Sequence, residues 1–321
     1  MAWDPLAGLR ERLHVTFGGG ESGVPQWQYD LENGDDGGFF APTSAVWSVH
    51  GGMTPIAAGV RALLVQALHP GALAGVAEHS DYEKDALGRL AGTIRWIFTV
   101  TYGDTAAAKG ACEMVRKMHV PVRGHYEGVG GEETYYSANS PHLGMWVHCA
   151  FADAFLSAYQ EYRGAVPLPP DALEGESGAD AYVREWAVAG EMMGVQNPPR
   201  SYAQLQEILA GFDERGELRC DERTTRVVGF IRRPPLDPAL NSGYSMLYRG
   251  AVDTLPARWR ELLGLRVTGI PLPGGRRVNL PWVGKLGAGS ILKLAGATLV
   301  KVGPAEQSAR RRMARLGAHG M

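Results

Sequence analysis

Residues 84–119 read KDALGRLAGTIRWIFTVTYGDTAAAKGACEMVRKMH, and two helical patterns meet in this stretch. The first covers 84–103 and carries an apolar stripe that ends at Gly103, a residue typical of helix C-termini (Leu87, Leu90, Ile94, Ile97 and Phe98). Asp104 or Thr105 then caps a second helix over 105–119. Four of its residues recur at i, i+4, i+7 and i+11, which predicts one buried face that includes a histidine (Ala108, Cys112, Val115 and His119).

Helical periodicity continues on both sides of this stretch. Further predicted helices cover 55–68, a segment that restarts after Pro70, Ser140 to about Tyr162, 179–194, 202–211, 222–232, 241–253 and 256–264. Alternating patterns typical of strands are scarce, and 264–272 (GLRVTGIPL) is the only modest candidate. We therefore expect a mainly α protein with one helical domain. An irregular N-terminal arm (1–54) would pack on a helical core (55–265), followed by a C-terminal extension (266–321).

Charge and cysteine content exclude several classes of function. Lys plus Arg number 32 against 34 Asp plus Glu, so no global positive field favours nucleic acid, and we expect no nucleic-acid partner. Cys112, Cys149 and Cys220 lie far apart without a CxxC pair, which argues against a disulfide framework or a cysteine zinc site. A reducing cytoplasm fits this pattern best.

Neither end of the chain shows a membrane-targeting pattern. The first twenty residues lack the continuous apolar core of a signal peptide, so we expect a cytoplasmic protein. Residues 286–303 (LGAGSILKLAGATLVKVG) are the most apolar late segment, but Lys293 and Lys301 interrupt it before the ~20 residues of a spanning helix. We interpret this segment as a core or docking helix, and leave open peripheral membrane contact and a homo-oligomer.

Several polar residues stand within the apolar helices. Arg89 and Thr93 lie four apart, so they could address one ligand together, although the spacing alone favours a surface arginine with a back-bonded threonine. His69 stands at a helix junction before Pro70, where its ring could satisfy loose backbone groups. His148 and Asp153 are candidate partners in a buried polar network.

His119 has two interpretations. A hydrogen-bonded core histidine is the more common one, and a ligand of a metal or haem is the other. Small neighbours at Ala108 and Cys112 leave room for a flat macrocycle, and Arg89 could pair with a propionate. Haem needs only one strong proximal nitrogen, whereas zinc needs three or four convergent ligands, so a lone histidine favours haem over zinc.

The chain resembles a known family in an ordered set of segments. These are GGFFAPTSAVWSVH, RALLVQALHPGALAGVAEHSDYEKDALGRLAGTIRWIFTVTYGD, VRKMHVPVRG, SPHLGMWVHCAFADAFLSAYQEY and LPARWRELLGL. Their order and spacing are similar to those of the family of the oxygenase MpaB and the rubber oxygenase called latex clearing protein, over roughly residues 35–265. The resemblance implies a haem b protein with a globin-like helical core that cleaves carbon-carbon double bonds of isoprenoid chains with dioxygen.

The resemblance also implies roles for single residues. His119 is the expected axial ligand of the haem iron, and Arg89 and Thr93 match an Arg-x-x-x-Thr motif at the haem edge and distal pocket. Gly92 stands where latex clearing protein has a lysine on the distal side of its iron, and its catalytic glutamate has no counterpart near 71–75 (GALAG). His69 is then the nearest candidate for a hydrogen bond to bound oxygen.

Three functions follow for testing. The first is a haem b-dependent oxygenase or related oxidoreductase that acts with dioxygen on a small apolar substrate of the isoprenoid or lipid class, with His69 and Thr93 as catalytic residues. The second is a haem-binding carrier or gas sensor without turnover. The third is a cofactor-free helical structural protein.

Overall fold

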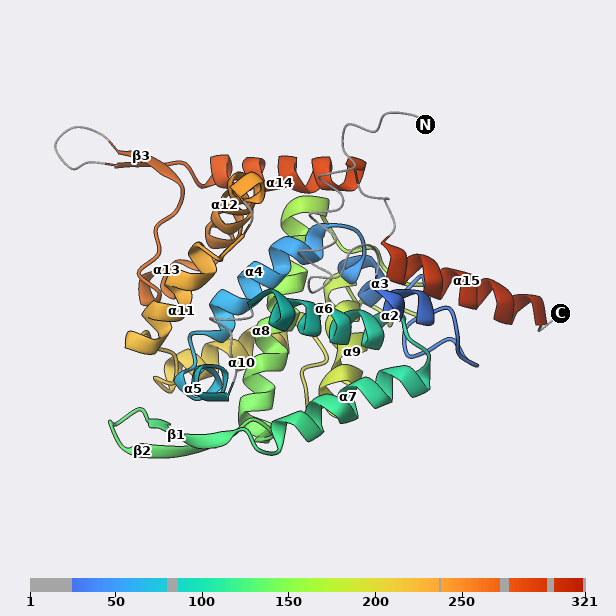
Figure 1. Cartoon of the computed structure of the whole chain (residues 1–321), viewed down its shortest axis with the longest axis horizontal. Helices are drawn as coiled ribbons and strands as arrows, with labels where there is room; N and C mark the ends of the chain where they lie inside the picture. Colours follow the sequence, from blue (N-terminus) through green and yellow to red (C-terminus); the bar gives the residue numbers. More distant parts are fainter. Residues whose placement is uncertain (1–24, 80–85, 237, 272–276, 299–302, 320–321) are drawn as a thin grey trace.

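The computed structural model describes residues 25–79, 86–236, 238–271, 277–298 and 303–319 (Figure 1). Within these ranges the chain forms fourteen helices and two short antiparallel hairpins. The predicted mainly α, single-domain fold is therefore confirmed. A globin-like arrangement of its core, and the boundaries at residues 54 and 265, stay predictions.

The helices and strands are bounded as follows. The helices are α2 (Gln26–Asp30), α3 (Ala45–His50), α4 (Thr54–Gln66), α5 (Pro70–His79), α6 (Ala86–Tyr102), α7 (Thr105–His119), α8 (Pro141–Arg163), α9 (Gly178–Met192), α10 (Tyr202–Glu214), α11 (Glu222–Arg232), α12 (Pro238–Asp253), α13 (Ala257–Leu262), α14 (Pro281–Thr298) and α15 (Pro304–His319). The strands are β1 (Arg123–Glu127), β2 (Glu133–Ser137), β3 (Gly269–Pro271) and β4 (Arg277–Asn279).

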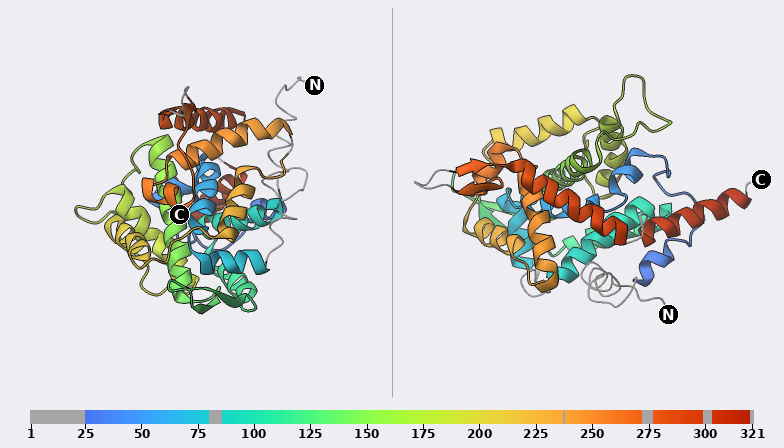
Figure 2. Two further views of the ribbon diagram at one scale, coloured as in Figure 1. Left: turned by 90° about the vertical axis from the view of Figure 1, so that its left-hand side faces the viewer. Right: turned by 90° about the horizontal axis from the view of Figure 1, so that it is seen from above.

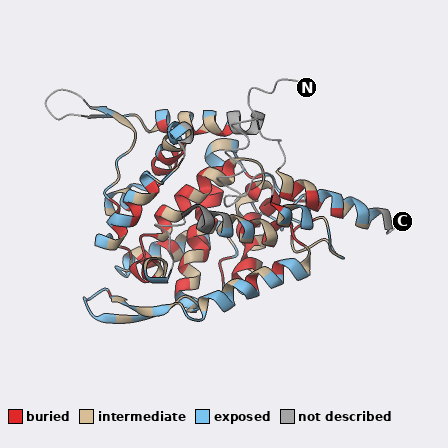
Figure 3. Cartoon of the chain, viewed as in Figure 1, coloured by how far each residue is buried: buried red, intermediate tan, exposed pale blue. Residues whose placement is uncertain are grey.

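Helices α4 and α8 form the centre of the molecule, and buried residues concentrate along both (Figure 3). Helix α8 begins with Pro141 directly after Ser140, since proline has the backbone angle of a first helical turn and needs no hydrogen-bond acceptor there. It ends at Gly164, whose φ of 92° suits glycine. Because α8 is apolar nearly all round, the other helices can pack on every side of it.

The N-terminal arm is more regular than predicted in the part that the structure describes. It contains α2 and α3, and the hydroxyl of Ser44 accepts a hydrogen bond from the Trp47 amide at the start of α3. Phe40 and Trp47 are both buried in the main hydrophobic core. The arm therefore contributes to the core of the helical body, and residues 1–24 of the arm lie outside the described ranges.

Two helices of the C-terminal extension attach at different places. Helix α14 packs on α12 and α4 through a small separate core (Ala57, Leu247, Ala288 and Leu292). Helix α15 returns to the arm, where the fully buried guanidinium of Arg312 donates to the carbonyls of Leu31 and Tyr102. Figures 1 and 2 show the two helices one after the other along one edge of the molecule.

The sequence patterns also missed the first hairpin. Strands β1 and β2 form a hairpin in register Arg123↔Ser137 to Glu127↔Glu133, and the polar sequences RGHYE and ETYYS gave no clear alternating pattern. The expected strand at 264–272 is confirmed only over β3, which pairs with β4. In the described ranges no single helix is long and apolar enough to cross a bilayer, whereas the bent pair α4 and α5, at 106°, passes that test of length and composition.

Candidate functional site

Helices α6 and α7 form an antiparallel hairpin that is tightly closed at the turn between them. Only Gly103 and Asp104 connect the two helices, and the Asp104 carboxylate accepts a hydrogen bond of 2.8 Å from the Ala107 amide. A Cβ added at Gly103 would lie 2.4 Å from the Thr99 carbonyl and 3.2 Å from the Cβ of Ala107. Glycine is therefore required where α6 ends and the chain turns into α7, since a side chain there would meet the last turn of α6 and the first turn of α7.

The hairpin loosens toward its other end. Halfway along the hairpin, the indole of Trp96 on α6 lies beside the thiol of Cys112 on α7. One helical turn further from the connecting turn, Gly92 and Thr93 of α6 are on the side that faces α7, and Val115 of α7 is on the side that faces α6. On α7, Ala108 and Cys112 are buried, but Val115 and His119 are only half-buried (Figure 3).

On α6 the trend is the same. Val100 is fully buried while Gly92 is exposed. A Cβ added at Gly92 would meet none of the described atoms within 4 Å. Because α7 diverges from α6 toward the β1–β2 hairpin in Figure 1, the helix pair forms a wedge that opens at the N-terminus of α6 and the C-terminus of α7.

Three of the four predicted site residues belong to this wedge. Thr93 lies half-buried on α6, and His119 is the last residue of α7. The backbone of Arg89 lies in the first turn of α6, and its side chain is outside the described part of the structure. Antiparallel pairing thus brings residues 30 positions apart in the sequence to the same end of one helix pair.

His69 lies elsewhere, in the turn between α4 and α5, and is fully buried. Its Nδ1 accepts hydrogen bonds from the amides of Gly71 (3.1 Å) and Ala72 (3.4 Å), two groups at the start of α5 that lack a partner within the helix. Since Nδ1 is an acceptor, the proton is on Nε2, which donates to the Glu217 carboxylate at 3.3 Å. His69 therefore satisfies loose backbone groups at the helix junction, as one interpretation of the sequence expects. Its hydrogen bond to bound oxygen stays a prediction.

Glu217 is the centre of a polar network. Burial favours the neutral acid, but hydrogen bonds from His69, Arg215 (2.5 Å) and His142 (2.6 Å) outweigh it and lower the pKa of Glu217 to about 2. Network residues come from the α4–α5 turn, the start of α8 and the segment after α10. The ionised carboxylate therefore ties together three parts of the fold.

The same network has the spacing of a metal site. Ligand atoms of His69, His142 and Glu217 lie within 4.8 Å of one another. A metal ion on Nε2 of His69 would require the proton to move to Nδ1, where two backbone amides already point their own hydrogens. We therefore interpret the trio as a hydrogen-bonded network that holds the helices together.

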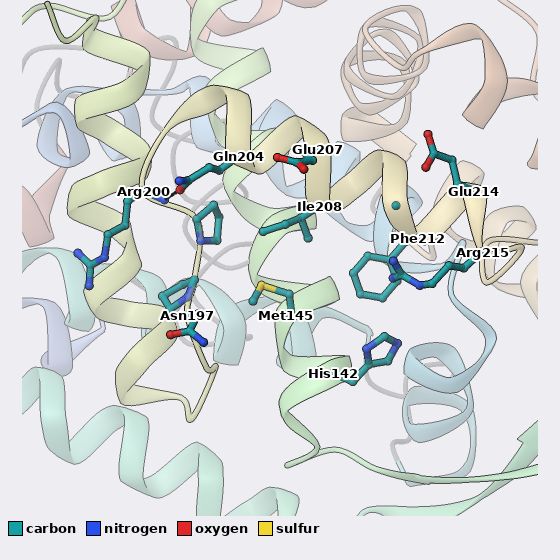
Figure 4. Close-up of a pocket in the computed structure, with 13 residues that line it drawn as sticks. His142, Met145, Asn197, Arg200, Gln204, Glu207, Ile208, Phe212, Glu214 and Arg215 are labelled. Carbon is teal, nitrogen blue, oxygen red and sulfur yellow. Dashed lines mark hydrogen bonds between the residues drawn. The ribbon is translucent and has the colours of Figure 1, made fainter.

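A surface cleft of about 770 Å³ lies beside this network, between α8, α10 and the segment that joins α9 to α10 (Figure 4). Met145, Ile208 and Phe212 supply its apolar part, and Arg200 and Arg215 stand at its sides. Both arginines are committed to carboxylates, Arg200 to Glu191 and Arg215 to Glu217. Of the four predicted site residues, none is among the described residues that line this cleft.

The interior holds two polar features whose partners the sequence did not indicate. Asp153 pairs with the buried guanidinium of Arg61 and also accepts from Gln206 at 3.3 Å, so the expected pairing with His148 is wrong. Positions 148 and 153 are five residues apart and face different sides of α8. His148 instead lies against Gly190 of α9, and its buried Nε2 has no hydrogen-bond partner among the described residues. Burial lowers the pKa of His148 to about 4.

A comparison with protein families identifies one that matches the chain. The family described as ER-bound oxygenase mpaB/B′ and rubber oxygenase, catalytic domain, matches residues 47–284. No curated protein and no solved structure matches the chain. The matched range contains the α6–α7 wedge, the Glu217 network and the central helices. By this match over most of its length, the chain belongs to the mpaB and rubber oxygenase family and carries an oxygenase catalytic domain.

Proposed function

We propose that this enzyme is a haem b-dependent oxygenase that acts with dioxygen on a small apolar substrate of the isoprenoid or lipid class. The observation that carries the proposal is the α6–α7 wedge, which opens where His119 ends α7 and where Gly92 leaves space on α6. A flat macrocycle fits between two helices that separate progressively, whereas a compact metal ion would need several converging ligands.

The chemistry of the wedge residues fits this group. The imidazole of His119 is a suitable axial ligand for iron. Cys112, two turns closer to the closed end, does not compete as a thiolate, because burial raises its pKa to about 11. Trp96 and Val115 add apolar surface on the two facing sides.

Each residue would contribute a separate function. His119 would hold the iron, Arg89 would pair with a propionate, and the hydroxyl of Thr93 would donate or accept a proton at the distal side. Bound haem would supply the activation of dioxygen. Gly92 would leave space on the side of the haem where the family resemblance places the lysine of latex clearing protein. The Nε2–H of His69 already donates to Glu217. We therefore assign the first hydrogen bond to bound dioxygen to Thr93, and His69 would make such a bond only after its bond to Glu217 breaks.

The optical spectrum tests the proposal directly. Protein produced with a haem precursor should show a Soret band and a pyridine haemochrome of haem b, and His119→Ala should lose or strongly shift that band. His125→Ala is the matched control, since His125 is an exposed histidine on β1 and six residues away. Colourless wild-type protein, or an unchanged spectrum in His119→Ala, would refute the assignment.

A second pair of variants tests the wedge itself. Gly92→Trp should lower haem content because the indole would occupy the open side of α6. Gly110→Trp is the control, because Gly110 is exposed on α7 and a Cβ there would also meet none of the described atoms within 4 Å. Equal haem content in the two variants would place the cofactor outside the wedge.

Turnover separates the oxygenase from a haem carrier or gas sensor. The loaded enzyme should consume dioxygen in the presence of a reductant and a terpenoid, and aldehyde or ketone products should appear. A protein that binds haem but forms no product with a panel of terpenoids and unsaturated lipids would be a carrier or sensor. The cofactor-free alternative predicts no haem in either assay.

A further inference from the structure

Helix α14 turns large apolar side chains toward solvent. Trp282, Val283 and Leu286 are 57%, 40% and 62% exposed, and Met246 of α12, beside Gly287, is 45% exposed. The exposed positions 282, 286 and 293 are spaced i, i+4 and i+11, so they share one face of the helix. We call Met246, Trp282, Val283 and Leu286 the α14 surface.

The opposite face of α14 makes the contacts with the body. Gly284, Ala288 and Leu292 are buried there, and the helices approach so closely that a Cβ added to Gly250 of α12 would lie 2.3 Å from the Cβ of Ala288. Gly284 and Ala288 thus allow the close approach of α14 to the body, while Trp282 and Leu286 remain outside. A helix with apolar residues on both faces normally has a partner on both faces.

A hairpin extends the exposed apolar area at the start of α14. Ile270 and Val278 are directly paired across β3 and β4, so their side chains lie on the same face, and they are 56% and 44% exposed. The hairpin leads into α14 through Leu280, whose amide donates to the Thr268 carbonyl. Figures 1 and 2 show the β3–β4 hairpin and α14 along the same edge of the molecule.

The charge of this region is strongly one-sided. Between Glu261 and Glu306 the sequence has no acidic residue but has six basic ones (Arg266, Arg276, Arg277, Lys285, Lys293 and Lys301). Arg266 is exposed, and Lys293 is exposed on the same face as Trp282. Lys285 pairs with Glu161 of α8 at 2.7 Å, and the nearby Asp253 is buried and bonded to Thr268.

We propose that the α14 surface docks on an anionic phospholipid bilayer, with Trp282 and Leu286 inserted at the level of the headgroups and Lys293 near lipid phosphates. One exposed face of α14 combines large apolar side chains with Lys293, and the sequence from 262 to 305 has no acidic residue, which matches the chemistry of such a membrane. A second copy of the chain fits less well, because a two-fold contact through this face would bring the basic residues of both copies together. The inference does not depend on haem or on turnover.

Binding to vesicles tests the docking surface. The full chain should float with vesicles of phosphatidylcholine mixed with phosphatidylglycerol, bind pure phosphatidylcholine vesicles more weakly, and dissociate as salt concentration rises. The contribution of Trp282 to the tryptophan fluorescence is the difference between the wild type and Trp282→Phe. Vesicles with brominated acyl chains should quench this contribution. Absence of binding to the anionic vesicles would overturn the proposal.

Apolar variants test which residues insert. Trp282→Ser with Leu286→Ser should lower the partition coefficient by about tenfold or more, because two large side chains no longer enter the interface. Leu168→Ser with Leu173→Ser is the matched control, since these loop residues are 58% and 60% exposed. Thermal unfolding and circular dichroism check that both double variants are folded. An equal loss of binding in the control would refute the assignment to α14.

A charge variant provides a test that leaves the apolar residues intact. Lys293→Glu should weaken binding to the anionic vesicles by at least about fivefold and leave binding to phosphatidylcholine vesicles nearly unchanged. Arg226→Glu, at an exposed position on α11, is the control. Analytical sedimentation tests whether a second copy of the chain occupies the α14 surface instead. If the wild type is a dimer and the double variant Trp282→Ser with Leu286→Ser is a monomer, this face is an interface between copies and the proposal is overturned.

Discussion

The interior around α4 and α8 and the open end of the α6–α7 wedge are built from similar helices, yet they pack around a histidine to different degrees. In the interior, His69 has both ring nitrogens in hydrogen bonds and no exposed surface. In the wedge, His119 lies half-buried at the end of α7, where the packing between helices has loosened. A histidine at a helix end can thus be part of the scaffold or a candidate ligand, and the packing around it decides which.

The largest expected effect is in the interior. Asp153→Ala should reduce the free energy of unfolding by about 3–5 kcal/mol, because Arg61 is 2% exposed and would keep a buried charge without its partner. Urea denaturation measures the change. Arg61→Met combined with Asp153→Ala should lose less stability than the single variant, and a larger loss in the double variant would contradict this explanation.

The second largest expected effect is a difference in stability between the His69 and His119 variants. His69→Ala should cost about 2–3 kcal/mol, since it removes a buried ring, the acceptor for two helix-start amides and a donor to Glu217. His119→Ala in haem-free protein should cost less than about 1 kcal/mol. Thermal and urea unfolding of both variants compare them. Equal losses would remove the distinction between scaffold and open wedge.

The Glu217 network predicts a pH dependence. The pKa of Glu217 is lowered from 4.5 to about 2, so its ionised form stabilises the folded state above the unfolded pKa, and this contribution is lost as the pH falls toward the folded pKa. Glu217→Gln should therefore be less stable by about 1–2 kcal/mol near neutral pH, and the difference should shrink below about pH 4.5. Urea midpoints measured from about pH 7 to about pH 3 test it, and a constant difference over that range would contradict the role of the carboxylate.

The smallest expected effect is in the wedge. Gly92→Ala should raise the free energy of unfolding by about 0.5–1 kcal/mol, because alanine favours the helix and its Cβ meets none of the described atoms within 4 Å. Gly103→Ala, at the closed end of the same hairpin, should be destabilising, since its Cβ would lie 2.4 Å from the Thr99 carbonyl. Thermal unfolding distinguishes the two. A gain at both positions would contradict the tight backbone geometry where α6 turns into α7.

Much of the helical architecture could be predicted from local patterns. The stripe over 84–103, the Gly103 terminator and the Asp104 cap predicted α6 and α7 to within a few residues. The β1–β2 hairpin was missed because its strands are mostly polar and pack on α5 with few apolar residues. Long-range pairs such as Arg61 with Asp153 and His69 with Glu217 join residues 92 and 148 positions apart, a distance that no local pattern reports.

The sequence by itself determined the helical class, the register that places His119 on the inner face of α7, and the family to which the chain belongs. Helical periodicity and capping are local properties, so the order of residues is sufficient for them. Only the tertiary structure decided that the helices around Thr93 and His119 diverge, that His69 is bonded into the scaffold, and that the larger apolar residues of α14 face outward. These features depend on which helices pack together and how closely, and that is set by contacts between residues distant in the sequence.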